Sequence, residues 1–377
     1  MDIGDRALRA HKKLRGKIEL ALKDDLDSQA KLSTYYTPGV AAVSRHTAKH
    51  PEQTRDYTWL NNLVAVVSDG SAVLGLGDIG PYGALPVMEG KAMLFKHFAG
   101  IDAVPIVLDV HSEDEIVEAV MAIAPSFGAI NLEDIAAPKC FAIEERLKKL
   151  LNIPVMHDDQ HGTAVVVLAG LINSLKIVGK EMGNCKIAIV GAGAAGTAVA
   201  KLLRLYANPE IVMVDSRGII SKSRKDLNPQ KTALLKFTNP EGISGDLDDA
   251  LDSADIFIGV SSPDLLNEAL IKRMADKPII FAMANPDPEI TPDKAKKAGA
   301  AVVATGRSDY PNQVNNALAF PGIFRGALDH GVRHITDSHK IAAAEAMAGL
   351  IRSPDSQQIL PAVLDKRLVP AIAKQIV

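Results

Sequence analysis

The segment Lys186-Ile-Ala-Ile-Val-Gly-Ala-Gly-Ala-Ala-Gly196 joins an apolar β-branched run to a glycine-rich turn and an alanine-rich continuation. This order predicts a strand, a tight turn and a helix. We expect Gly191 to form the turn, Gly193 to let backbone N–H groups approach a phosphate, and Gly196 to let the helix pack closely on the strand. Because the helix dipole favours an anion at that turn, the segment is typical of a dinucleotide pyrophosphate site.

Three polar residues after the following strands fit the same cofactor site. Asp215 ends the next predicted strand, about 20 residues further along, where a carboxylate accepts a hydrogen bond from a ribose 2′-hydroxyl. Its charge would repel a 2′-phosphate, which favours NAD, whereas Arg217 could attract one and leaves NADP possible. Ser261 and Asn285 each follow a strand of the same sheet, so we expect them to line the cofactor cleft, although both also suit ordinary turns.

The chain as a whole predicts an α/β protein of two domains. Apolar runs alternate with helical patterns in both halves, which indicates mostly parallel sheets. We predict an N-terminal α/β domain over residues 1–160 and a Rossmann-like, doubly wound NAD-binding domain over residues 161–377 that ends in C-terminal helices. Residues 6–30 read as one or two amphipathic helices, kinked near Gly16. The expected strands lie near residues 63–67, 104–108, 129–132, 153–156, 186–190, 210–214, 255–260, 279–283 and 301–304.

Bulk composition excludes several classes of partner. The 377 residues carry a formal net charge of −3 and only 4% aromatic side chains, so nucleic acid is not an expected partner. Cys140 and Cys185 are too few for a disulfide framework, and we expect two buried free thiols. The N-terminus does not resemble a secretory signal, and no apolar run reaches the ~18 residues that span a bilayer. We therefore expect a cytoplasmic protein without a membrane partner.

Two pairs of acidic residues, Glu133-Asp134 and Asp158-Asp159, each follow a short apolar run. Either pair alone suits a solvated turn or a helix cap. Together, at strand ends of one sheet, they predict a divalent cation site with Glu133, Asp134 and Asp159 as ligands, because Mg2+ and Mn2+ prefer carboxylate oxygens. A metal site and a redox-cofactor site in one chain indicate metal-assisted hydride chemistry.

The second acidic pair permits a rival interpretation. His157-Asp-Asp-Gln-His161 places two histidines four residues apart, close to the His-Glu-x-x-His motif of zinc proteases. That motif needs an established helix, whereas this segment follows a strand-like run and the helix is predicted to begin only around Gly162-Thr163. We therefore expect the two histidines to fix the loop by hydrogen bonds.

Lys91 stands in a run that is apolar on its C-terminal side. A partly desolvated lysine near a bound cation has its ammonium form disfavoured and can act as a base near neutral pH. The alternative is a surface lysine whose stem snorkels along apolar neighbours. The segment Ser68-Asp-Gly-Ser-Ala-Val-Leu-Gly-Leu-Gly-Asp78 follows a predicted strand and predicts a close approach of backbone, either a site wall or a tight corner.

Over roughly residues 35–330 the chain resembles the malic enzymes, specifically their short bacterial form. The resemblance rests on seven motifs in the same order: Tyr36-Thr-Pro-Gly, Leu74-Gly-Leu-Gly-Asp78, Glu89-Gly-Lys91, Leu132-Glu-Asp134, His157-Asp-Asp-Gln-His-Gly-Thr163, the dinucleotide segment, and Asn315-Asn316-Ala-Leu-Ala-Phe-Pro-Gly322.

The resemblance implies oxidative decarboxylation of (S)-malate to pyruvate and CO2, with NAD or NADP and with Mg2+ or Mn2+. It implies that Glu133, Asp134 and Asp159 hold the metal. It further implies roles for six other residues: Lys91 as general base, Tyr36 as general acid, Asp158 as the partner that orients Lys91, Asn285 and Asn316 as substrate ligands, and Asn315 as their neighbour. A homodimer is expected, with the site in the cleft between the two domains.

Two features separate this chain from larger malic enzymes, and three other functions compete. Ser71-Ala72 stands where larger members carry a substrate-binding arginine, and the chain is much shorter than those members, so their allosteric sites cannot be transferred to it. The competing functions are a malolactic activity that releases lactate, a non-catalytic dinucleotide sensor, and an amino-acid dehydrogenase with a lysine base. A sensor would not need Lys91 and Tyr36, and a dehydrogenase of that type would not need the acidic pairs.

Overall fold

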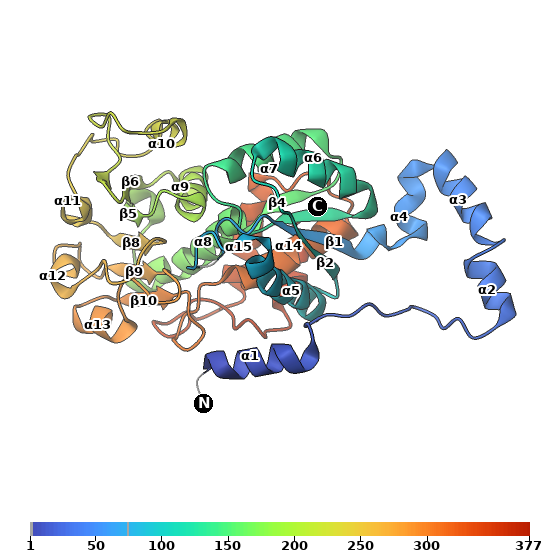
Figure 1. The fold of residues 1–377 in the computed structure, drawn as a ribbon. Coiled ribbons are helices and arrows are strands. Elements are labelled where there is room, and N and C mark those ends of the chain that lie inside the picture. The colour runs from blue at the N-terminus through green and yellow to red at the C-terminus, as the bar shows by residue number, and fades with distance from the viewer. Residues whose placement is uncertain (1–2, 74) are drawn as a thin grey trace.

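The computed structural model describes residues 3–73 and 75–377, and its N-terminal half is built on a four-stranded parallel sheet (Figure 1). The strand order is β2-β1-β3-β4, and every strand pair in it is parallel. The strands are β1 (Leu63–Ser68), β2 (Asp102–Val107), β3 (Ala129–Leu132) and β4 (Val155–His157). β1, β3 and β4 are buried at every position, as their continuous apolar runs require.

The second half contains a six-stranded sheet of order β10-β9-β8-β5-β6-β7. Its strands are β5 (Lys186–Val190), β6 (Glu210–Asp215), β7 (Gly218–Ile219), β8 (Ile256–Gly259), β9 (Ile279–Ala282) and β10 (Val302–Thr305). Only β7 is antiparallel. The sequence did not predict this two-residue strand, but it placed the other nine within a few residues. The doubly wound order brings the carboxyl ends of β5, β6 and β8 to one edge, where a cofactor binds.

Helices cover the first sheet and carry several site residues. They are α5 (Gly80–Ala99), α6 (Glu113–Ile123) and α7 (Lys139–Leu150), with the 3-10 helices η2 (Trp59–Asn62) and η3 (Ala124–Ser126). α6 begins with the expected capping box between Ser112 and Glu115. α5 ends where Gly100 adopts a φ of 64°, which satisfies the last carbonyls of the helix.

One long helix, α8 (Asp158–Val178), runs through the core between the two halves. Its apolar side chains belong to a single hydrophobic cluster that also takes residues from both sheets. In the described part of the chain α8 is the one helix with the length and composition to cross a membrane, and 72% of that window is buried inside the protein. The composition of α8 is therefore that of a core helix.

The remaining helices complete the second half and close over the first. They are η4 (Met182–Asn184), α9 (Ala194–Ala207), α10 (Pro229–Leu234), α11 (Leu247–Leu251), α12 (Glu268–Ile271), α13 (Pro292–Lys297), η5 (Asn316–Leu318), α14 (Phe320–Asp329), α15 (Asp337–Gly349) and α16 (Leu368–Ala373). α9 and α15 pack on α8, and α14 packs on α5, so C-terminal helices contact the N-terminal half directly. The boundary at residue 160 stays a prediction.

The start of α8 differs from the sequence-based expectation. We expected the helix to begin near Gly162, but it begins at Asp158, so Asp158 and Asp159 form its first turn. Acidic side chains are favourable there because they face the positive end of the helix dipole. Gly162 does not mark the start of the helix. It lies within α8, where it allows side chains to approach closely.

The N-terminal segment contacts the body of the molecule at Lys17 and Arg55, and between these points it reaches away from it. It contains α1 (Ile3–Leu14), α2 (Gln29–Tyr35), α3 (Val40–Lys49), η1 (Pro51–Gln53) and α4 (Thr54–Tyr57), and none of these has a buried residue. Of the one or two helices expected over residues 6–30, the first ends at Leu14, close to the expected break at Gly16, but residues 18–28 are not helical. In Figure 1 the blue α2 and α3 stand at the far edge of the molecule, separated from α5.

Candidate active site

Lys91 lies on α5 and is buried between two carboxylates. Its Nζ is 2.6 Å from Asp158 Oδ2 and 2.7 Å from Glu133 Oε1. The same Nζ stands 4.2 Å from the centre of the Phe320 ring, a cation–π contact that the sequence did not reveal. The alternative of a surface lysine is wrong, because the side chain is only 7% exposed. Residues far apart in sequence thus hold one ammonium group in a fixed place.

The charges around Lys91 reverse one expectation about its protonation. Burial lowers the pKa of Lys91, but the carboxylates of Asp158 and Glu133 outweigh it and raise that pKa above the ordinary value. We had expected the ammonium form to be disfavoured. Burial raises the pKa of Asp158 to about 7, although Lys91 opposes this. Lys91 and Asp158 therefore form a strongly interacting buried pair. A cation bound nearby would be needed to favour the neutral amine of Lys91.

The three carboxylates predicted to bind a metal lie together at the carboxyl ends of β3 and β4. One oxygen from each of Glu133, Asp134 and Asp159 falls within 4.8 Å of the others. The backbone N–H of Asp134 donates to Asp159 Oδ2 at 2.8 Å, and Asp134 holds a φ of 52°, which L-residues rarely adopt. This backbone conformation turns the Asp134 side chain into the group.

The donor set fits a hard divalent cation. All three potential ligands are carboxylates, the type that Mg2+ and Mn2+ prefer. Burial, reinforced by neighbouring negative charge, raises the pKa of Glu133 and lifts that of Asp159 to about 6. A cation among these oxygens would remove the repulsion that causes part of these shifts.

The two histidines of the zinc-like motif take different positions. His161 Nε2 lies 2.8 Å from Glu144 Oε2, and His157 Nε2 lies 3.8 Å from Asp159 Oδ2. Burial lowers the pKa of His161 to about 4, so at neutral pH its uncharged ring donates to Glu144. Among the described residues, neither histidine belongs to the metal-compatible group. The hydrogen-bonding role expected for the histidines holds for His161, whereas the His157 ring is fully buried and its Nε2 is too far from Asp159 for a hydrogen bond.

Gly162 is a residue of the site that sequence reasoning overlooked. A Cβ at this position would lie 1.9 Å from Asp158 Oδ1 and 3.0 Å from Asn316 Cβ. The missing side chain thus lets the Asp158 carboxylate fold back over its own helix and brings Asn316 close to it. Asn315, in contrast, caps η5: its side chain accepts from the N–H of Ala317 at 2.8 Å.

The glycine-rich loop after β1 forms a wall between the two halves. A Cβ on Gly75 would come within 2.2 Å of the Asn285 carbonyl oxygen, so the loop touches the segment that follows β9. Asp69 anchors the loop, because its buried carboxylate accepts from Ser71 and pairs with Lys139. The close backbone approach expected here is confirmed. Leu74 of the same motif lies outside the described residues.

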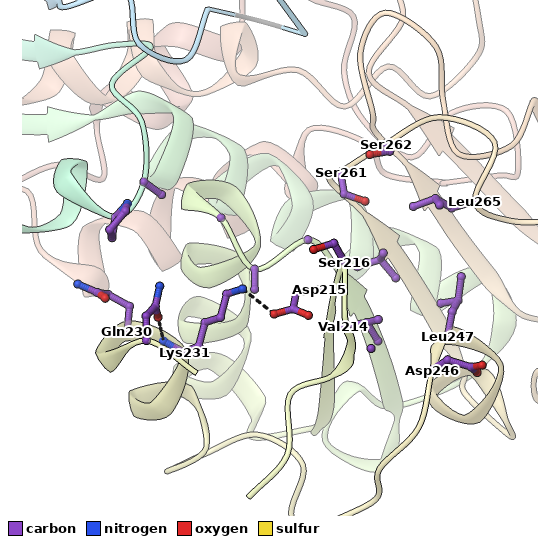
Figure 2. A pocket seen from close by; sticks show the side chains of 18 of the residues that line it. Val214, Asp215, Ser216, Gln230, Lys231, Asp246, Leu247, Ser261, Ser262 and Leu265 are labelled. Atoms are coloured by element: carbon purple, nitrogen blue, oxygen red, sulfur yellow. Dashed lines mark hydrogen bonds and ion pairs between the residues drawn. The ribbon is translucent and has the colours of Figure 1, made fainter. Parts of the chain in front are cut away.

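A cleft of about 680 Å³ follows the glycine turn between β5 and α9 (Figure 2). Gly191 has a φ of 113° and lies against Val260, and a Cβ on Gly196 would sit 1.8 Å from the Gly191 carbonyl oxygen. A Cβ on Gly193 would meet no described atom within 4 Å, so the turn faces open space there. The cleft and the start of α9 therefore suit a dinucleotide pyrophosphate.

Asp215 lines this cleft but is already held by cations. Arg224 Nη1 lies 2.7 Å and Lys231 Nζ 2.5 Å from its carboxylate, and Figure 2 shows Lys231 reaching toward it. Burial raises the pKa of Asp215, but hydrogen bonds from Arg224 and Lys231 outweigh it and lower that pKa. The negative charge that we expected to repel a 2′-phosphate is thus largely neutralised by side chains that the sequence pattern did not connect to it.

Ser261 and Asn285 occupy the loops after β8 and β9. Ser261 lines the cofactor cleft, and its N–H donates to Glu289. Asn285 lies at the contact with Gly75 and does not line the cleft itself. Its position at the junction of the halves suits the predicted substrate role better than the predicted cofactor role.

Tyr36 stands apart from every other predicted site residue. It follows α2 on the protruding N-terminal segment and is 66% exposed. Figure 1 shows α2 far from α5, so within a single chain Tyr36 does not meet Lys91.

Comparison with known proteins identifies the family. A family model described as "Malic enzyme, N-terminal domain" matches residues 15–114 and 110–148. A second model, "Malic enzyme, NAD binding domain", matches residues 160–377. This chain belongs to the malic enzyme family. The "Bifunctional malic/malolactic enzyme" of Bacillus subtilis is 53% identical over all of this chain and 92% of its own length. The "NADP-dependent malic enzyme" of Halomonas elongata is 48% identical over 93% of this chain and 83% of its own.

A solved structure agrees with this assignment. The NAD-dependent malic enzyme from Thermotoga maritima superposes with a TM-score of 0.95 at 51% identity, covering 98% of both chains. The resemblance in sequence motifs is thereby confirmed over the whole fold. The chain is an oxidoreductase that decarboxylates malate oxidatively, and its redox partner is NAD or NADP.

Proposed function

We propose that this chain converts (S)-malate to pyruvate and CO2 with NAD, at a site where Lys91 is the general base and a tyrosine is the general acid. The observation that carries the assignment is the buried Lys91 ammonium between Asp158 and Glu133, beside three clustered carboxylates. This arrangement argues against a dinucleotide sensor, which needs neither a buried base nor a cation site. It also argues against an amino-acid dehydrogenase, which does not need the carboxylates.

Each residue has a distinct part in the proposed mechanism. Lys91 Nζ would accept the proton of the malate C2 hydroxyl while the C2 hydride leaves for the nicotinamide. Asp158 would keep Lys91 oriented and share its proton. After CO2 has left, Tyr36 would donate a proton to C3. Asn285 and Asn316, placed where the two halves meet, would hold the substrate carboxylates.

Glu133, Asp134 and Asp159 are the proposed ligands of Mg2+ or Mn2+. Such an ion would supply Lewis-acid chemistry, lowering the pKa of the substrate hydroxyl and stabilising enolate charge. The ion would also engage Glu133, one of the two carboxylates that keep Lys91 protonated. A metal-loaded site therefore favours the neutral amine that the base role requires.

NAD is the proposed cofactor, with NADP as a weaker substrate. Asp215 remains close to where a 2′-hydroxyl would lie, which supports NAD. Its pairing with Arg224 and Lys231 reduces its ability to exclude a 2′-phosphate, which supports some use of NADP.

We further propose a cytoplasmic homodimer in which the partner subunit supplies the tyrosine. Tyr36 cannot act beside Lys91 of its own chain, because α2 stands at the other side of the molecule. The segment around it carries apolar side chains that remain between 36% and 54% exposed: Leu32, Tyr35, Val40 and Val43. A second copy would bury these side chains and bring Tyr36 to a site that is incomplete without it.

The activity is tested with purified protein, malate, Mn2+ and either NAD or NADP. We expect pyruvate, CO2 and reduced cofactor in equal amounts, a higher kcat/KM with NAD, and loss of activity on chelation that Mn2+ restores. Because the Bacillus subtilis relative is named as bifunctional, lactate is measured as well. Lactate without net NADH would replace the proposal with the malolactic activity, and activity that survives chelation would contradict the metal site.

A further inference from the structure

Glu289 is a fully buried carboxylate in the loop after β9 that the mechanism above does not use. Its Oε2 accepts from the N–H of Ala284 at 3.0 Å, and its Oε1 accepts from the N–H of Ser261 at 3.3 Å. The main chain reinforces this link, since Leu266 donates to the carbonyl of Glu289 at 3.0 Å. One side chain thus joins the loop that carries Ser261 to the loop that carries Asn285.

The strand beside Glu289 makes room for this carboxylate. A Cβ on Gly259, the last residue of β8, would lie 2.3 Å from Glu289 Cδ and Oε1. The glycine therefore allows the carboxylate to lie across the ends of β8 and β9. Any larger residue at 259 would push it away from the two N–H groups.

Burial of this charge is costly for stability alone. In the described part of the chain Glu289 forms no ion pair with a lysine, arginine or histidine, and only backbone N–H groups stabilise it. A buried carboxylate without a cation is usually less favourable than a neutral side chain of similar shape. The contact of this charge with Ser261, which lines the cofactor cleft, indicates a role in the site.

We propose that Glu289 is a positioning residue that fixes the spacing between the loops of Ser261 and Asn285, and so sets how the nicotinamide end of the cofactor meets the substrate. The inference rests on the proposed function, because it assumes that this cleft binds the dinucleotide. Ser261 faces the cleft, while Asn285 faces the N-terminal half, so a change in their spacing would alter both cofactor affinity and hydride transfer.

Protonation of Glu289 would weaken the same link. An ionised carboxylate accepts from both N–H groups, whereas a protonated one offers a hydroxyl in place of one acceptor. Burial raises the pKa of Glu289, and the N–H groups of Ala284 and Ser261 oppose this only in part. Asp287 on the same loop and Arg307 after β10 pair with each other at 3.3 Å, and among the residues that the structure describes no charged side chain is one of the groups that shift the pKa of Glu289. Cofactor affinity should therefore fall as the pH is lowered.

The test compares Glu289→Gln with the wild-type protein and with Glu210→Gln as a matched control. Glu210 begins β6 at the opposite edge of the same sheet, and burial raises its pKa too. The dissociation constant of NADH is measured by fluorescence from about pH 8 to about pH 5, and kcat and KM are measured with malate. We expect Glu289→Gln to weaken NADH binding about tenfold, to lower kcat, and to remove most of the pH dependence.

Glu210→Gln should match the wild-type protein in all three measurements. Unchanged NADH affinity and kcat in Glu289→Gln, or a wild-type pH dependence in that variant, would overturn the inference. Should Glu289→Gln not fold, Glu289→Asp replaces it: the shorter acid should weaken NADH binding but keep the pH dependence, and wild-type affinity would overturn the proposal. A wild-type chain that fails to oxidise malate would contradict the proposed function itself, which is a separate outcome.

Discussion

At the scale of single residues, the buried lysine shows how the site combines charge and shape. Lys91 meets Asp158 and Glu133, and Gly162 provides the space into which the Asp158 carboxylate folds. The aromatic ring of Phe320 lies 4.2 Å from the same Nζ. Such a dry environment makes protonation of the lysine sensitive to any change in nearby charge.

Replacing Lys91 by alanine should abolish turnover without affecting the cofactor. We expect kcat to fall about a thousandfold, the usual contribution of a general base, with the NADH dissociation constant within about twofold of the wild type. The control is Lys96→Ala on the same helix, whose exposed side chain pairs with Asp102. Turnover near the wild-type value in Lys91→Ala would show that another group is the base.

We expect Asp215 to influence whether the adenosine end of the cleft accepts a 2′-phosphate. In Asp215→Asn the cations Arg224 and Lys231 would lose their carboxylate, and they should attract the phosphate instead. We expect the ratio of kcat/KM for NADP to that for NAD to rise about 10- to 100-fold. The matched control is Asp226→Asn, since Asp226 binds the same Arg224 but does not line the cleft. A ratio that stays constant in Asp215→Asn would exclude this residue from cofactor selection.

At the scale of elements, α7 and α8 are joined by one carboxylate near the site. Glu144 on α7 accepts from the N–H of His157 at 3.0 Å, binds His161, and pairs with Lys148 at 2.6 Å. These contacts hold the first turn of α8, and with it Asp158 and Asp159, against the N-terminal sheet. Glu144 therefore fixes the position of α8 relative to α7 and to the strand ends of the first sheet.

The protonation of Glu144 should make this link depend on pH. Burial raises the pKa of Glu144, but His161 and Lys148 outweigh it and hold that pKa well below the ordinary value. Because the unfolded chain binds this proton at higher pH than the folded chain, the stabilisation is present above the ordinary pKa and is lost as the pH falls toward the folded value.

We therefore expect Glu144→Gln to lower the free energy of unfolding by about 1–3 kcal/mol at neutral pH, and by progressively less in acid. The measurement is denaturant unfolding at several pH values. Glu145→Gln, which changes the exposed neighbouring acid, is the control and should have little effect. An effect of Glu144→Gln that is equal at all pH values would contradict the assigned charge.

At the scale of the whole molecule, the N-terminal helices are much less packed than the rest of the chain. The two sheets share one hydrophobic cluster through α8, whereas α1, α2 and α3 bury none of their residues within the chain. Exposed apolar side chains on these helices fit the proposed interface with a second copy of the chain. The second copy of the chain is the partner that would also complete the chemistry.

Mixing two inactive variants tests the shared site directly. In a heterodimer of Lys91→Ala and Tyr36→Phe, exchange of the tyrosine would give one site with both changes and one site with neither. Random assembly should then restore about one quarter of the wild-type activity. If each chain used its own Tyr36, every site would carry one defect and mixing would restore nothing. Analytical ultracentrifugation of the mixture confirms that dimers are present.

Local patterns in the sequence determined the nine parallel strands of the two sheets, the dinucleotide turn and the acidic residues at the strand ends, but not the antiparallel β7. They could do so because strand runs, glycine turns and strand-end positions depend on neighbours along the chain, and parallel strands bring their carboxyl ends to one edge. The structure adds that the carboxylates of Glu133, Asp134 and Asp159 come within 4.8 Å of one another.

Only the tertiary structure decided the electrostatics of the site and the place of Tyr36. The raised pKa of Lys91, the cations on Asp215 and the link through Glu289 join residues whose separation along the chain carries no signal of contact. The protruding α2 could not be predicted either, because the pattern of residues along a short helix does not show whether it packs on the body of its own chain or stays exposed, as α2 does. Distances and burial decide such properties, and these exist only once the chain is folded.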